Sequence, residues 1–193
     1  MREPESCRAV VAECIDHLGG LDALVYAPGV AVVTELRDAT SDHWRSVFET
    51  NVIGSGLVTA AAVDHLAATE GIAVFFSSVS AHVTPPWVGM GLYAASKAAL
   101  EKSVQVWKLE HPTVRFTTMV VGSTSGTSFF ASAEKPQPDR VERYQDEWRA
   151  RGYLAQEQLT PDDQASALVD VLESRAQIDS IWVRPRTLLQ LPD

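Results

Sequence analysis

Residues 71–78, GIAVFFSS, are followed after a loop by residues 92–109, LYAASKAALEKSVQVWKL, and this pair of segments decides the fold class. The first segment is a short apolar run, which is typical of a strand buried on both faces of a parallel sheet. The second segment has a helical pattern and ends before His111-Pro112, because proline cannot continue a helix. A buried strand followed by a helix is the repeating unit of a parallel α/β sheet with right-handed crossovers.

The same alternation of apolar strands and amphipathic helices extends in both directions along the chain. The further predicted elements are a helix at about 8–18, a strand at 21–27, a helix at 42–68, a strand at 113–121, a helix at 160–174 and a strand at 178–185. Thr40 or Ser41 could cap the long helix, and Thr160-Pro161 is a strong helix start. With 193 residues, the chain is predicted to form a single partial domain over 1–193.

Composition excludes several classes of function. The chain has 16 basic and 25 acidic residues and a net charge of −9, which argues against nucleic acid or an anionic membrane surface as a partner. We expect no membrane span and no signal peptide. The spacing of Cys7, Cys14 and the histidines suggests no metal site. We expect both cysteines to be reduced thiols, as in a cytoplasmic protein.

The sequence changes character after Gly122. A small, polar loop leads to a proline-interrupted stretch and then to a short surface helix at about 140–152. A long irregular insertion in a compact domain is usually functional and often a lid, so we predict a lid-like insertion at about 123–155.

Ligands of parallel α/β sheets bind beyond the carboxyl ends of the strands. The residues that follow the predicted strands are 27–29, 77–80 and 122–127, and the last two segments are rich in small polar side chains. This rule gathers the serines and Tyr93-x-x-x-Lys97 near one rim of the sheet. A tyrosine and a lysine four residues apart lie on the same face of a helix, although such a pair on its own is usually surface decoration.

Five segments, taken in order and spacing, resemble the short-chain dehydrogenase/reductase family. They are LDALVYAPG (21–29), FETNVIGSG (48–56), VFFSSVS (74–80), YAASKAAL (93–100) and RFTTMVVGSTSGT (115–127). The resemblance implies a Rossmann-like parallel sheet that is truncated to strands 4-5-6-7 of the family's seven. It also implies an NAD(P)-dependent oxidoreductase that interconverts an alcohol and a ketone by hydride transfer.

The resemblance implies a catalytic role for each of four side chains. Tyr93 would be the acid or base, and the positive charge of Lys97 would lower the tyrosine pKa from its usual value of about 10. Asn51 would position Lys97 through a water molecule. The serine that binds the substrate oxygen would be Ser78, which fits the SSVS pattern best, or Ser80, which has the commoner spacing from Tyr93.

The implied cofactor is NAD or NADP. Its expected contacts are Ala27, Gly29, Tyr93, Lys97, Gly122 and Thr124. The family's glycine-rich turn and first three strands do not occur in this sequence, so strand 21–27 becomes a sheet edge. We expect that edge to be covered by a second copy, a partner chain or residues outside this sequence.

The expected substrate is a small apolar alcohol or ketone. Its contacts would be Ser80, Trp87, Phe129 and Phe130. Tyr144 and Trp148 would either cover the pocket or decorate an exposed helix. The resemblance also implies a homo-oligomer formed through helices 42–68 and 92–109.

Two other functions stay open. A non-catalytic relative could serve as a binding or subunit module after losing the cofactor half, and intact Asn51, Ser78, Tyr93 and Lys97 argue against it. Epimerase or dehydratase chemistry on a nucleotide sugar shares the Tyr-x-x-x-Lys pattern, and the insertion is small for such a substrate domain.

Overall fold

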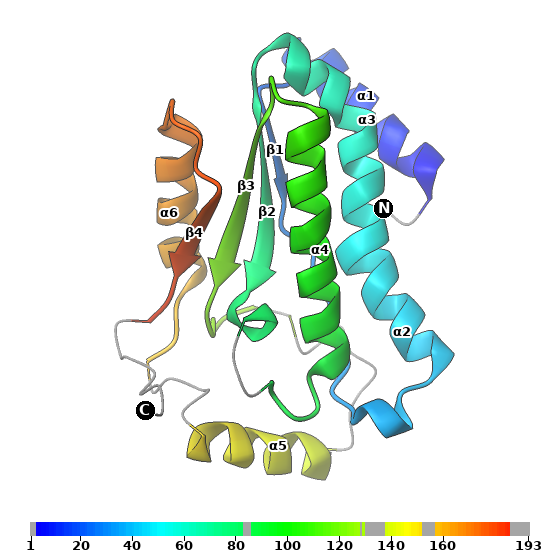
Figure 1. Cartoon of the computed structure of the whole chain (residues 1–193), viewed down its shortest axis with the longest axis vertical. Helices are drawn as coiled ribbons and strands as arrows, with labels where there is room; N and C mark the ends of the chain where they lie inside the picture. The colour runs from blue at the N-terminus through cyan, green and yellow to red at the C-terminus, as the bar shows by residue number, and fades with distance from the viewer. Residues whose placement is uncertain (1–2, 83–85, 128, 130–137, 152–156, 186–193) are drawn as a thin grey trace.

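The computed structural model describes residues 3–82, 86–127, 129, 138–151 and 157–185, and it has the predicted α/β architecture (Figure 1). One parallel sheet has the strand order β1-β2-β3-β4. The strands are Ala23–Tyr26, Ile72–Ser78, Arg115–Val121 and Ser180–Val183. The truncated, Rossmann-like parallel sheet that the resemblance implied is therefore present, with shorter outer strands than the sequence pattern predicted.

Helices cover both faces of this sheet (Figure 1). They are α1 (Pro4–Leu18), α2 (Ser41–Phe48), α3 (Gly54–Ala68), α4 (Gly91–Glu110), α5 (Pro138–Ala150) and α6 (Pro161–Glu173). Helices α1, α3 and α4 share a core with one face of the sheet, around Phe75 and Phe116. Helix α6 packs on the other face, where Val171 joins Val74 and Met119.

Two helix starts have the chemistry that the sequence predicted. At α2 the cap is Thr40, whose hydroxyl accepts a hydrogen bond from the backbone N–H of His43. At α6 the cap is Thr160, whose hydroxyl accepts a hydrogen bond from the backbone N–H of Asp163. The Asp163 carboxylate accepts in turn from the backbone N–H of Thr160, and Pro161 occupies the first helical position. Each reciprocal pair satisfies backbone donors that the helix itself cannot satisfy.

The predicted helix 42–68 is interrupted by one π-helical turn, η2 (Glu49–Ile53). Such a turn widens the helix locally and often marks a functional position. Asn51 lies in this turn and is fully buried. The turn therefore presents the amide of Asn51 to the loop after β1.

The stretch Ser41–Ala68 is long and apolar enough to cross a membrane by length and composition, which the sequence analysis did not expect. In the fold, Val58, Ala62 and Leu66 of this stretch are buried against the sheet and α1. Core helices of globular domains pass the same compositional test, and 44% of the apolar window is buried in this fold.

Helix α5 lies across the carboxyl ends of the strands (Figure 1). Its side chains Tyr144 and Trp148 are 2% and 1% exposed, so the alternative that these two rings decorate an exposed helix face is wrong, although other residues of α5 are exposed as predicted for a surface helix. Both rings pack with Trp87 and Met90 in one apolar cluster. Residues 128, 130–137 and 152–156 of the predicted lid lie outside the described part of the chain.

Candidate active site

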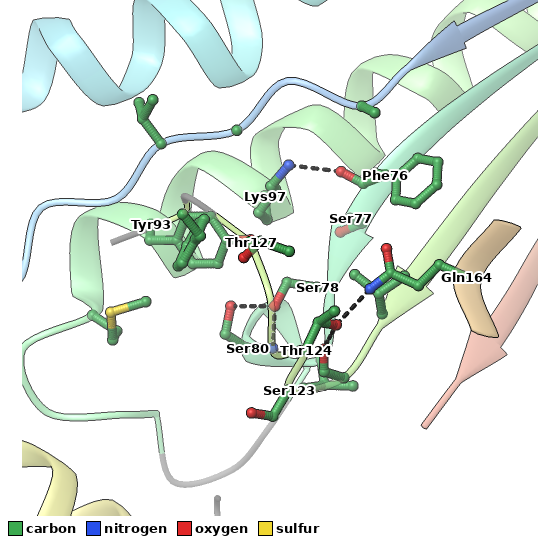
Figure 2. Close-up of a pocket in the computed structure, with 18 of the residues that line it drawn as sticks. Phe76, Ser77, Ser78, Ser80, Tyr93, Lys97, Ser123, Thr124, Thr127 and Gln164 are labelled. Carbon is green, nitrogen blue, oxygen red and sulfur yellow. Dashed lines mark hydrogen bonds between the residues drawn. The ribbon is translucent and has the colours of Figure 1, made fainter. Parts of the chain in front are cut away.

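A cavity of about 520 Å³ opens at the carboxyl ends of the strands. The loops after β1, β2 and β3 form its walls together with the first turns of α4, as the topology rule predicted. Figure 2 shows the serines, Tyr93 and Lys97 around it. The predicted residues that line it are Ala27, Gly29, Ser78, Ser80, Trp87, Tyr93, Lys97, Gly122, Thr124 and Phe129. Phe130 lies outside the described residues.

Tyr93 lies near the start of α4 and is 7% exposed. Burial raises the pKa of its hydroxyl to about 12, and a hydrogen bond with the Ser78 side chain acts in the lowering direction. The Phe129 ring packs edge-on against it, with 5.0 Å between ring centroids. The expected lowering of the tyrosine pKa is therefore not what this environment produces, because desolvation penalises the phenolate.

Lys97 lies one helical turn after Tyr93 and is 2% exposed. Its ammonium nitrogen donates to the Phe76 carbonyl oxygen at 2.6 Å and lies 5.7 Å from the centroid of the Tyr93 ring. Burial lowers the pKa of this ammonium to about 8, and the nearby Glu101 carboxylate acts in the raising direction. Lys97 is therefore a cation held in a dry site, within reach of a ligand in the cavity.

The two candidate serines have different positions. The hydroxyl of Ser78 accepts from the hydroxyl and the backbone N–H of Ser80, at 3.0 and 3.2 Å, and lies close enough to Tyr93 to act on the tyrosine pKa in the lowering direction, against burial. Ser80 belongs to the short helix η3 (Val79–Ala81) and reaches Tyr93 through Ser78. This geometry favours Ser78 as the partner of a substrate oxygen and Ser80 as the residue that orients Ser78.

Asn51 is brought close to Lys97, and its side chain makes three direct hydrogen bonds. Its side-chain amide pairs with both the N–H and the carbonyl of Val30 at 2.9 Å, and it donates to the Ser96 hydroxyl at 2.9 Å. These three bonds clamp the loop after β1 onto α4. Sequence reasoning missed Ser96, although it lies between Tyr93 and Lys97 in the motif itself.

Glycine at position 29 allows a close approach between that loop and the lysine. A side-chain Cβ at Gly29 would lie 3.4 Å from the Lys97 ammonium and 3.9 Å from the Asn51 amide oxygen. A larger residue there would fill the space in front of the ammonium. The loop therefore leaves a cradle for a hydroxylated ligand beside Lys97.

The loop after β3 carries the other predicted cofactor contacts. Thr124 donates to the Gly122 carbonyl at 3.0 Å and accepts from the Gln164 amide of α6. Gln164 lines the cavity and was not predicted, because a single glutamine on a helix has no motif around it. Its position follows only from how α6 packs against the sheet.

Comparison with known proteins agrees with this arrangement. The family described as short chain dehydrogenase matches residues 1–138. The 11-beta-hydroxysteroid dehydrogenase-like 2 of Arabidopsis thaliana is 31% identical over 142 residues, covering 72% of this chain and 43% of that protein. The 11-beta-hydroxysteroid dehydrogenase A of Arachis hypogaea is 34% identical over 110 residues, covering 56% of this chain and 31% of that protein. This chain thus spans less than half the length of these curated relatives.

Solved structures share the fold over almost the whole chain. An alcohol dehydrogenase from Thermococcus sibiricus, complexed with 5-hydroxy-NADP, superposes with a TM-score of 0.78 at 21% identity, over 100% of this chain and 74% of that one. A short-chain dehydrogenase from Streptomyces avermitilis has a TM-score of 0.77 at 22% identity, over 94% of this chain and 67% of that one. The chain belongs to the short-chain dehydrogenase/reductase family.

Proposed function

We propose that this chain forms the nicotinamide and substrate side of an NAD(P)-dependent oxidoreductase that interconverts a ketone and an alcohol. The observation that carries the proposal is the convergence of Tyr93, Ser78 and Lys97 on one cavity at the carboxyl edge of the sheet. A proton donor, a hydrogen-bond donor for a developing oxyanion and a fixed cation are the groups that carbonyl reduction requires.

The chain's own residues would act on the substrate oxygen. A ketone oxygen placed between the Tyr93 and Ser78 hydroxyls would accept a hydrogen bond from each, and Tyr93 would give up its proton as negative charge develops. Because burial raises the pKa of Tyr93 to about 12, the hydroxyl holds its proton at neutral pH. This favours the direction in which Tyr93 acts as an acid, namely ketone reduction.

The cradle beside Lys97 fits the ribose and nicotinamide end of the cofactor. The Lys97 ammonium already donates to Phe76, and an ammonium has three donors, so it can also bind ribose hydroxyls. Gly29, Gly122 and Thr124 would contact the same end of the ligand. When bound, the cofactor supplies or accepts the hydride.

The substrate would be an apolar ketone or alcohol. Trp87, Met90 and Phe129 line the cavity on the α5 side, where the side chains are apolar or aromatic. Relatives named for 11-beta-hydroxysteroids are consistent with a rigid, apolar substrate. We therefore propose a cyclic or otherwise bulky ketone rather than a charged one.

We also propose a homo-oligomeric, cytoplasmic protein. Large apolar side chains are exposed on the two helical regions named in the sequence analysis, including Ile53 at 49% and Leu109 at 80%. Cys7 and Cys14 carry thiols and are not joined in a disulfide, which fits a reducing compartment.

The test is a titration of the purified chain with NADH and NADPH, followed by cofactor fluorescence and melting temperature. Saturable binding to a folded sample, with a raised melting temperature, is the expected result. Tyr93→Phe should then lower turnover of a cyclic ketone by about 10²–10⁴-fold, with a much smaller effect on cofactor affinity, because only one of the expected cofactor contacts is altered. Absence of binding with either cofactor would favour the non-catalytic alternative.

Tyr26→Phe is the matched control. Tyr26 is also a buried tyrosine, but its hydroxyl donates to the Thr50 carbonyl at 2.6 Å, and Tyr26 does not line the cavity. Its loss should cost about 1 kcal/mol of stability and leave turnover unchanged. Equal losses of turnover in both variants would show that a general effect on folding, rather than proton transfer by Tyr93, is responsible.

A further inference from the structure

Residues 86–90 form a wall of the cavity that belongs to no helix or strand. Trp87 and Met90 of this wall line the cavity and are 8% and 2% exposed. Within the wall, the backbone N–H of Met90 donates to the Trp87 carbonyl at 3.1 Å. The loop after β1 adds a second bond, from the N–H of Thr34 to the Gly89 carbonyl at 2.9 Å. Because no regular secondary structure fixes this wall, its position depends on the side chains packed behind it.

Trp148 of α5 contacts this wall from behind in two ways. Its ring packs on the ring of Trp87, with 5.6 Å between centroids and an angle of 37° between the ring planes. Its indole N–H donates to the carbonyl of Val88, the residue after Trp87, at 2.9 Å. Trp148 itself is 1% exposed, and of these two tryptophans it is Trp87 that lines the cavity. One indole therefore fixes both the Trp87 ring and the backbone next to it.

The neighbours of Trp148 leave its ring little room to move. Tyr144, one turn earlier on α5, stacks on the Trp148 ring with 6.2 Å between centroids and an interplanar angle of 15°. The Tyr144 hydroxyl is held in turn by the Glu35 carboxylate at 3.0 Å. Both α5 rings belong to one buried cluster with Trp87 and Met90. Protein interiors are close-packed and transmit changes of volume to their neighbours, so the space that Trp148 fills decides where the Trp87 ring lies.

We propose that Trp148 is a specificity-determining residue that sets, through Trp87, how large a ketone the apolar end of the cavity accepts. The inference rests on the proposed function, because that function makes the cavity a ketone site. Trp148 acts as a positioning residue: it holds the Trp87 ring, and the ring limits the space for the substrate. Removal of the indole leaves apolar space behind Trp87, into which the Trp87 ring can retreat. The cavity then gains room at its apolar end.

The selectivity between a small and a large ketone is the quantity that reports on Trp148. One methylene more or fewer in an apolar pocket changes kcat/KM by about 10–200-fold, so a shifted aromatic wall has a measurable effect. A loss of folding or of proton transfer lowers turnover of both ketones by the same factor. A wall that has moved changes the ratio of the two instead.

The first test compares kcat/KM for cyclohexanone and for the bicyclic 2-decalone, with NADH and NADPH. Trp148→Ala should raise the preference for 2-decalone at least about tenfold, chiefly through a lower KM for that ketone. Trp148→Phe keeps an aromatic ring against Trp87 and should stay close to the wild-type preference. Trp107→Ala is the matched control, because Trp107 packs with His111 in the other core and does not line the cavity, so its preference should equal that of the wild type.

An unchanged preference in Trp148→Ala would overturn the inference. Should the alanine variant not fold, Trp148→Leu takes its place, since leucine retains more of the volume of the indole. It should shift the preference in the same direction by a smaller factor, and wild-type preference in a folded Trp148→Leu would count against the inference equally.

A second test needs no turnover and separates this inference from the proposed function. In protein labelled with ¹³C-methyl methionine, the NMR signal of Met90 reports on the cavity, and Met119 in the core on the other face of the sheet is the internal reference. Titration with each ketone gives two dissociation constants, and Trp148→Ala should shift their ratio toward 2-decalone at least about tenfold.

The outcomes of this titration are distinct. Equal ratios in the wild type and Trp148→Ala would refute the inference, even in a protein that reduces ketones. A shifted ratio without turnover in any variant would support the role of Trp148 and count against the proposed oxidoreductase. No change of the Met90 signal with either ketone, in any of the proteins, would refute both.

Discussion

Lys97 has an ammonium group at a position where almost no water reaches it. One hydrogen bond to the Phe76 carbonyl and the field of Glu101 offset part of the desolvation cost, and the remaining cost lowers the pKa to about 8. The buried ammonium therefore costs stability, and its charge is available to a ligand in the cavity. Active-site residues of this kind are a common reason why function and stability conflict.

The stability cost of burying the Lys97 ammonium can be measured in the variant Lys97→Met. A pKa lowered from 10.5 to about 8 means that the unfolded chain binds more protons than the folded chain between about pH 8 and pH 10.5. Stability of the wild type should therefore rise with pH across this window. Since one pKa unit corresponds to about 1.4 kcal/mol and the lost hydrogen bond to about 1 kcal/mol, Lys97→Met should be about 1–3 kcal/mol more stable at pH 7.

Urea unfolding at pH 7 and pH 10 checks this prediction. The stability advantage of Lys97→Met should shrink at pH 10, where the folded wild type buries a neutral amine. Lys102→Met is the matched control, because Lys102 is an exposed lysine on the same helix. A constant difference between wild type and Lys97→Met at both pH values would contradict a lysine pKa near 8.

Helix α5 packs behind Trp87 and Met90, two of the apolar residues that line the cavity. Its Tyr144 hydroxyl donates to the Glu35 carboxylate at 3.0 Å, and the Trp148 indole N–H donates to the Val88 carbonyl at 2.9 Å. Next to Val88, the backbone of Gly89 has a φ of 82° and lies against the Tyr144 ring. The helix is thus held by two side-chain hydrogen bonds and by one close contact with backbone.

Gly89→Ala tests that close contact, with Gly126→Ala as its control. Both glycines have positive φ, so both variants carry the strain of a left-handed alanine, about 1 kcal/mol. A Cβ at Gly89 would lie 3.1 Å from the Tyr144 ring, whereas at Gly126 the nearest atom is Cδ of Pro161 at 3.9 Å. Gly89→Ala should therefore cost about 1–3 kcal/mol more in urea unfolding. Equal costs in the two variants would show that the Tyr144 ring shifts to make room for the added Cβ.

The whole molecule has two surfaces on which further chains could pack. Strand β1 is the outer strand of the described sheet, paired on one side with β2, and Val25 within it is 36% exposed. The helical surface formed by α2, η2, α3 and α4 exposes Trp44, Ile53, Val106 and Leu109. Exposed apolar side chains on these helices are the positions at which the predicted oligomer can be tested.

Light scattering on charge variants tests the predicted homo-oligomer. Ile53→Glu and Leu109→Glu should each shift the wild-type oligomer to a smaller species, because a buried unpaired carboxylate is costly in an interface. Val169→Glu on α6 is the control, since Val169 is as exposed as Ile53, at 49%, and α6 lies on the opposite face of the sheet. A monomeric wild type at micromolar concentration would contradict the oligomer, and dissociation by Val169→Glu would place the interface on α6.

The sequence by itself determined the order of elements and the family. Apolar periodicity located the strands around Val74 and Met119, and the i, i+4 spacing placed Tyr93 and Lys97 on one helical face. Both signals depend only on the local sequence, so they can be recognised without knowledge of the tertiary packing. The topology rule then gathered the small polar residues after each strand at one edge.

Only the tertiary structure decided the surroundings of those residues. Tyr93 and Lys97 are buried by residues from several elements. The hydrogen bonds of Asn51 with Val30, and those of Ser77 and His82 with Glu101, likewise join segments that are far apart in sequence. A pKa depends on the solvent and charges within a few ångströms, and these come from several elements at once. For the same reason the sequence pattern of α5 indicated a surface helix but left open whether Tyr144 and Trp148 were buried, because their burial depends on packing against Trp87 and Met90.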